Sequence, residues 1–210
     1  MKTYQYAGDP FEEPRSHPWL AAVANPESRY YDFTATPALI RSSLEDLLPW
    51  SRFPGVDAFY ELLEHLNHPK SALESNDCAF TGPHGNEDST IPKALQCCGR
   101  VMVLFRALER NTEDSLWAWL RTELHVELSQ LDSAFQWGAV GTTQIPVRYL
   151  ALPAADGRQL GSQLMISFWA WGDRELDTMQ NWARVIKNLA RALRRVSASA
   201  GALVASHGRN

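Results

Sequence analysis

The residues best suited to covalent chemistry lie in one polar stretch, residues 68–91. It holds Cys78 and His84, with Asp77 beside the cysteine. A cysteine attacks as its thiolate and needs a base to form that thiolate. The spacing therefore permits a small cysteine- and histidine-dependent hydrolase or transferase. Because no nucleophile elbow or protease signature accompanies these residues, we expect no catalytic residues and keep the enzyme as the alternative function.

Metal binding is the second kind of chemistry to weigh. His65 and His68 stand three residues apart, and Cys78 and His84 follow at longer intervals. This spacing corresponds to no zinc finger, and the side chains of the adjacent cysteines at 97–98 diverge in either a helix or a strand. The sequence therefore predicts no metal site and no cofactor.

The distribution of charge indicates which class of ligand the protein could bind. The formal net charge is −4, but residues 173–210 carry +4, so the first 172 residues carry −8. An acidic body argues against general nucleic-acid binding, which needs a basic footprint, and it fits a basic protein partner. No glycine-rich phosphate cradle occurs either. We expect a protein partner, with neither nucleic acid nor membrane.

Size and cysteine content suit a cytoplasmic domain. A chain of 210 residues with 45% apolar residues can bury a core without disulfide bonds or a structural metal ion. Its three cysteines, two of them adjacent, form no disulfide framework and suit a reducing compartment. No apolar run reaches the roughly 18 residues of a membrane span, and the first residues lack a secretory leader's apolar core.

The strongest apolar run is Leu164–Trp171, followed by Gly172 and Asp173. Side chains alternate along a strand, so Phe168 and Trp169 face opposite sides. One side must meet the helices, and the simpler reading of the other is a second covering layer. Without such a layer, Trp169 and Trp171 form an aromatic patch of the kind that marks a binding surface. The acidic residues expected around that partner-binding patch are Asp77, Glu87, Asp88 and Asp173.

Apolar residues recur at three- and four-residue spacing in four segments, which predicts four helices. These segments are residues 36–48, 54–67, 111–131 and 174–197. Thr36 is the expected N-cap of the first and Asn111 that of the third, and Pro49 should end the first.

The last predicted helix divides into two sides. Its apolar stripe consists of Trp182, Ile186, Leu189, Leu193 and Val196. Its opposite side carries Arg184, Lys187, Arg191, Arg194 and Arg195. A helix lying on a core with its charged side in water has this pattern, so we interpret the basic side as solvated surface.

Strands are predicted at residues 2–6, 29–33, 100–106, 135–140, 145–152 and 164–171. Residues 92–108 also fit helical spacing, and their β-branched residues favour the strand. Residues 141–144 have the length of a hairpin connection. Residues 68–91 are predicted to form a long loop, within which Cys78–Thr81 could form a short strand. Neighbouring strands joined by short turns imply an antiparallel meander.

The layout over residues 36–196 resembles the immunity proteins of bacterial polymorphic toxin systems of the type VI secretion type, of the kind paired with restriction-endonuclease-fold toxins. Two features carry the resemblance: Gly99-Arg100 opening an apolar run, and the Phe-Trp-Ala-Trp-Gly-Asp segment at 168–173 before a long final helix. The resemblance implies a cytoplasmic protein that neutralises a nuclease effector by blocking its active site or its assembly. It assigns no role to any single residue.

The sequence therefore predicts an α+β fold in which an antiparallel sheet of about four to six strands packs against several helices, ending in a long amphipathic helix. Residues 1–35 should form an arm packed on the body, 36–197 a single domain, and 198–210 a flexible tail. We expect an immunity-type protein, monomeric or homodimeric, that binds a cognate toxin. A non-enzymatic adaptor or assembly subunit is a further alternative.

Overall fold

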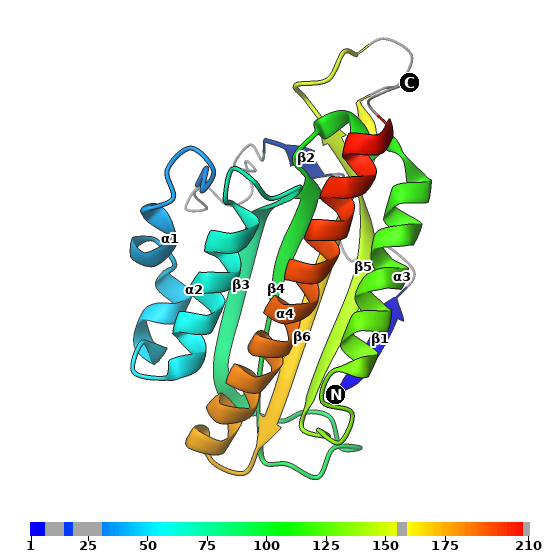
Figure 1. Ribbon diagram of the computed structural model, residues 1–210. Helices are drawn as coiled ribbons and strands as arrows, with labels where there is room; N and C mark the ends of the chain where they lie inside the picture. The colour runs from blue at the N-terminus through cyan, green and yellow to red at the C-terminus, as the bar shows by residue number, and fades with distance from the viewer. Residues whose placement is uncertain (7–14, 19–30, 155–158, 208–210) are drawn as a thin grey trace.

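The computed structural model describes residues 1–6, 15–18, 31–154 and 159–207. Six strands of this part of the chain form one sheet (Figure 1). They are β1 (Lys2–Tyr6), β2 (Arg15–His17), β3 (Leu73–Gly85), β4 (Leu95–Phe105), β5 (Gly138–Tyr149) and β6 (Leu160–Gly172). The strand order is β1-β5-β6-β4-β3, and β2 also pairs with β5. The strand predicted to be the sheet's centre, β6, is confirmed there.

The sheet is mixed. The pairs β3–β4, β4–β6 and β6–β5 are antiparallel, whereas β1 and β2 run parallel to β5. The predicted α+β class is confirmed, and the wholly antiparallel sheet was wrong for the two N-terminal strands. Sequence patterns show hairpins through their turns, whereas a pairing such as Lys2 with Ala139 leaves no local signal.

The three longer helices all cover the same face of the sheet (Figure 1). They are α2 (Pro54–Leu66), α3 (Asp114–Gln130) and α4 (Glu175–His207). Helix α4 crosses the middle of the sheet, with α2 on one side and α3 on the other. The shorter elements are α1 (Leu39–Ser42) and the 3-10 helices η1 (Glu45–Trp50) and η2 (Leu108–Thr112).

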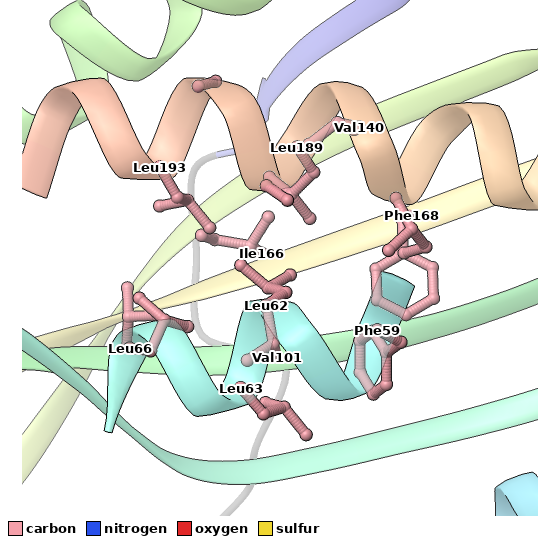
Figure 2. Packing of buried hydrophobic residues seen from close by; sticks show 14 of the residues in the cluster. Phe59, Leu62, Leu63, Leu66, Val101, Val140, Ile166, Phe168, Leu189 and Leu193 are labelled. Atoms are coloured by element: carbon pink, nitrogen blue, oxygen red, sulfur yellow. The ribbon is translucent and has the colours of Figure 1, made fainter. Parts of the chain in front are cut away.

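The core lies between this helical layer and the sheet (Figure 2). Phe168 and Ile166 on β6 are fully buried beneath α2 and α4. Trp182 on α4 is fully buried as well, with its ring 4.4 Å from that of Phe80 on β3. The apolar stripe predicted for the last helix and the core-facing side predicted for Phe168 are therefore confirmed.

The long loop predicted for residues 68–91 is wrong, because most of it forms β3, and only the short strand considered at Cys78–Thr81 is confirmed within it. The pairing of β3 with β4 runs from Leu73 opposite Phe105 to Gly85 opposite Leu95, with irregularities after Ser75 and Thr81. This strand is rich in Ser, Asn, Asp, Gly and Pro, which strands avoid in general. It lies at the sheet's edge, where such residues and bulges are tolerated.

The first predicted helix is broken into α1 and η1, and Thr36 is not its N-cap. The hydroxyls of Ser42 and Ser43 donate to the carbonyls of Ala38 and Leu39. Such bonds from serine side chains compete with helix continuation. The helix predicted at 54–67 is confirmed as α2.

Two further boundaries differ from the prediction. No turn occurs at residues 141–144, because β5 continues through the buried Thr142 and Thr143. The last helix reaches His207, so the predicted flexible tail is helical up to that residue. The strand predicted at 100–106 is confirmed as far as Phe105, within the longer β4. A strand was also predicted at 29–33. Residues 31–33 of that segment form no strand, and residues 29–30 lie outside the described residues.

Candidate partner-binding surface

The three longer helices α2, α3 and α4 leave one face of the sheet uncovered, since all of them lie on the other (Figure 1). Trp169 on β6 points to this open face, because it alternates with the core residue Phe168. The ring of Tyr6 on β1 meets the Trp169 ring edge-on at 6.4 Å between centroids. The ring of Tyr4 lies 6.0 Å from that of Tyr6. We name these three residues the aromatic row.

The aromatic row combines exposure with close packing. Tyr4 and Tyr6 are 40% and 45% exposed, and Trp169 is half-buried. Gly141 on β5 makes the contact possible, since a Cβ there would lie 2.6 Å from the Tyr6 ring and 3.1 Å from the Trp169 ring. Partly exposed aromatic rings held on a rigid strand are the side chains that protein interfaces use as anchors.

Trp171 does not belong to the aromatic row. It is only 6% exposed, its backbone N–H donates to the carbonyl of Trp137, and its own carbonyl accepts a hydrogen bond from the amide of Asn181. The second layer considered from the sequence is not seen among the described residues. The predicted exposed pair is not formed either, because Trp171 is buried and Trp169 is half-buried.

Three of the predicted acidic residues gather at the end of the sheet where β6 finishes. The Asn86 side chain donates to three carbonyls of the β3–β4 connection and fixes its shape. Glu87 and Asp88 stand exposed on that connection. Asp173 lies next to it, with one carboxylate oxygen 2.6 Å from the Lys93 ammonium. We name Glu87, Asp88 and Asp173 the acidic end.

Asp88 is held in its ionised form by its neighbour Thr90. The hydroxyl and N–H of Thr90 both donate to Asp88, and these bonds lower the pKa of its carboxyl below the ordinary value. Trp171 pairs with Gln96 and Gly172 with Leu95, which places the end of β6 beside this connection. The structure therefore brings Trp171, already near Trp169 on the same strand, together with the acidic end.

Asp77 lies elsewhere. It pairs with Met102 on β4, six positions from Gln96, which is about 20 Å at the rise of a strand. Its carboxylate lies 2.7 Å from the Arg15 guanidinium and 3.5 Å from that of Arg100. A pocket of about 490 Å³ opens beside these three residues and the edge of β3. Asp77 therefore belongs to an internal charge cluster rather than to the acidic end.

The residues of the enzymatic alternative do not converge. Cys78 pairs with Val101 and His84 with Gln96, five positions apart on β4, which is about 17 Å. Burial raises the pKa of the Cys78 thiol to about 12, which opposes thiolate formation. His84 contacts the Gly82 carbonyl and the Gln96 amide. Proton transfer needs hydrogen-bond reach, which this pair lacks.

A buried polar cluster lies at the opposite end of the open face from the acidic end. His17 on β2 is 8% exposed, with its Nε2 3.9 Å from the Glu74 carboxylate on β3. Arg106 lies 3.3 Å from the same carboxylate, and the Tyr149 ring packs 5.7 Å from that of His17. Burial lowers the pKa of His17 and raises that of Glu74. No sequence spacing brings these residues together, so sequence reasoning missed them.

Metal ligation and membrane crossing find no support in the described residues. No group of three or more His, Cys, Asp or Glu side chains within this part of the chain is placed to hold a metal ion. None of the helices that the structure describes combines the length and apolarity needed to cross a bilayer.

The fold and surface define a two-layer α+β protein with helices on one side of a mixed sheet and an aromatic row on the other. Comparison of the chain with models of known protein families, with curated proteins and with solved structures finds no match.

Proposed function

We propose that this protein is a non-enzymatic, immunity-type protein that binds a cognate toxin and neutralises it by direct contact. The observation that carries the proposal is the aromatic row, which is partly exposed on the face that α2, α3 and α4 leave uncovered. Exposed aromatic side chains on a rigid sheet lose little conformational freedom on binding, which favours tight association.

The distribution of charge supports a basic partner. The acidic end lies beyond the same strand that carries Trp169, and its Glu87 and Asp88 have no ion-pair partner among the described residues. The chain up to residue 172 carries −8 in all. A toxin that acts on nucleic acid presents a basic cleft, and an acidic surface beside aromatic anchors would cover such a cleft and attract it over distance.

Co-expression with the product of the adjacent reading frame tests the proposal. We expect the two proteins to co-purify and the complex to rescue growth of cells producing the toxin. Tyr6→Ala combined with Trp169→Ala should weaken binding by at least about tenfold, as expected when interface anchors are truncated. The matched control is Leu48→Ala with Leu160→Ala, which removes two exposed apolar side chains away from the aromatic row.

Charge reversal tests the acidic end separately. Glu87→Lys with Asp88→Lys should slow association, whereas Glu109→Lys with Asp114→Lys makes the same change at exposed positions elsewhere and should not. Absence of both complex and growth rescue would refute the proposal. Constitutive self-association through the aromatic row, without a toxin complex, would instead identify an assembly subunit.

A further inference from the structure

The outer surface of the helical layer is hollowed between α2 and α4. One hollow of about 450 Å³ is lined by the start of α2 and by α4 residues from Leu176 to Arg191. A second of about 320 Å³ follows further along α4. Lys187 and Arg191 line both hollows, so the two form one continuous groove. The helices α2 and α4 that line this groove cover the face of the sheet opposite the one to which Trp169 points (Figure 1).

Some of the cationic side chains along this groove have a carboxylate partner and others do not. Arg184 pairs with Asp132, Arg194 lies 4.0 Å from Glu61, and Arg195 lies 2.8 Å from Glu127. Lys187 and Arg191 are exposed and have no carboxylate partner within the described residues. The solvated-surface interpretation from the sequence accounts for the charge, and it does not account for a groove with two unneutralised cations at its centre.

Like charges also repel one another here. Lys187 and Arg191 are four residues apart on one helix, and Arg191 stands three and four residues from Arg194 and Arg195. Like-charged pairs at these spacings destabilise a helix, and an anion placed between them relieves that repulsion. The helix therefore carries a cost that an acidic ligand would remove.

The groove also has an apolar component. Leu176 is 51% exposed at one end, and Phe53, Met179 and Ala183 lie beside it. Nucleic acid or an anionic bilayer would need many unpaired cations, and this surface offers two at its centre within a chain of net charge −4. Two free cations with an apolar wall suit a short segment bearing acidic and apolar side chains.

We propose that the groove between α2 and α4 binds an acidic, amphipathic peptide segment of a partner protein, through Lys187 and Arg191 on its carboxylates and Leu176 on its apolar side chains. This site is independent of the function proposed for the aromatic row, because the helices that line it cover the face of the sheet opposite the one to which Trp169 points.

A fluorescein-labelled peptide with Glu and Asp on one side of a helix and Leu on the other provides the probe, and fluorescence anisotropy with the full chain provides the measurement. We expect saturable binding that weakens with added salt. The same peptide with Gln and Asn replacing the acidic residues should bind at least about tenfold more weakly.

Lys187→Glu with Arg191→Glu should weaken peptide binding by at least about tenfold. The matched control is Lys70→Glu with Arg148→Glu, an equal charge change at exposed positions away from the groove, which should leave binding unchanged. Leu176→Ser should weaken the peptide without changing the net charge. A circular dichroism spectrum of each variant verifies that α4 remains folded.

Three outcomes would overturn the inference. The first is no saturable peptide binding, and the second is equal loss in the groove and control variants. The third is preference for a single-stranded oligonucleotide, or for vesicles of phosphatidylglycerol and phosphatidylcholine in equal parts, with no effect of Leu176→Ser. That third result would identify a general polyanion surface instead.

Discussion

At the scale of single residues, burial outweighs charge pairing in the cluster around β2. His17 and Glu74 lie 3.9 Å apart, and an ion pair would raise the pKa of the histidine and lower that of the carboxyl. The pKa values move the other way, because both groups lose water: His17 below its ordinary value and Glu74 above it. His65 on α2 behaves like His17, with burial again the main cause of its lowered pKa. Buried neutral histidines of this kind make stability depend on pH.

The protein should lose stability as the pH falls from 7 through the ordinary histidine pKa of 6.5. The unfolded chain takes up protons on His17 and His65 there, whereas the folded chain does so only at lower pH. His17→Gln with His65→Gln should flatten the pH dependence of the free energy of unfolding, measured in urea. The raised pKa of Glu74 makes the free energy of unfolding fall as the pH rises above 4.5, which is the opposite direction. The unfolding free energy of the variant is therefore compared with that of the parent at each pH.

His125→Gln, at an exposed position, is the control for that pH series and should keep the slope of the parent. A double variant whose unfolding free energy falls as steeply as the parent's between pH 7 and 5 would show that these two histidines do not carry the effect.

At the scale of elements, the helical layer depends on close approach between α2 and α4. Gly55 in the first turn of α2 lies against the buried Trp182 ring, where a Cβ would come within 2.7 Å of the indole. Asn111 plays a comparable part between β4 and η2. Its side chain accepts a hydrogen bond from the N–H of Phe105 and donates one to the Phe105 carbonyl, each at 2.8 Å. Both residues hold neighbouring elements together.

Gly55→Ala should destabilise the protein by about 2 kcal/mol, because the added methyl group overpacks a site closed by the rigid Trp182 ring. Gly85→Ala is the control, since no atom lies within 4 Å of a Cβ placed there. Urea unfolding of both variants measures the difference. Equal stability of the two would show that α2 can move away from α4 at little cost.

Asn111→Ala should cost about 2–3 kcal/mol, since it leaves the backbone groups of Phe105 unpaired in a buried environment. Thr112→Ala, one residue further along η2, removes an exposed hydroxyl and should change the unfolding free energy by less than about 0.5 kcal/mol. A small effect at Asn111 would mean that water replaces its side chain.

At the scale of the whole molecule, β2 links distant strands of the sheet. It pairs with β5, while its Arg15 and His17 side chains reach Asp77 and Glu74 on β3 at the opposite edge. The sheet must curl to allow these contacts, so polar side chains fill one end of its open face. The aromatic row occupies the other end, where Tyr4 and Tyr6 are exposed among the described residues.

Asp77→Asn should therefore lower stability by about 2 kcal/mol, because it leaves two partly buried arginines without their shared carboxylate. The sequence suggested a role for Asp77 in partner binding instead. Measuring unfolding free energy and toxin affinity on the same variant distinguishes the two roles: unchanged stability with weakened binding would contradict the structural one.

The elements with a local signature were predictable. The apolar stripe of α4, the helix α2 and the central β6 follow from spacing that a single element imposes on its own residues. Strand β3 was not predictable, because an edge strand tolerates residues that interior strands exclude. Nor was Asn111, whose capping-type side chain serves a strand end rather than the helix after it.

Part of the candidate surface could be predicted from the sequence. Alternation along β6 placed Trp169 on the face away from Phe168, and the acidic end was named residue by residue. Its aromatic partners Tyr4 and Tyr6 were not, because they reach Trp169 across β5 from a strand more than a hundred residues away. Pairing between distant segments is what a single sequence conceals.

The parallel pairing of β1 with β5 has a consequence for the order in which the chain assembles during synthesis. Lys2 pairs with Ala139, so β1 has no partner until the residues of β5 have been made. Loop closure over such a separation is slow, and β3, β4 and α2 can associate meanwhile. The aromatic row can therefore form only after β5 and β6 have been made, because Tyr6 reaches Trp169 across β5.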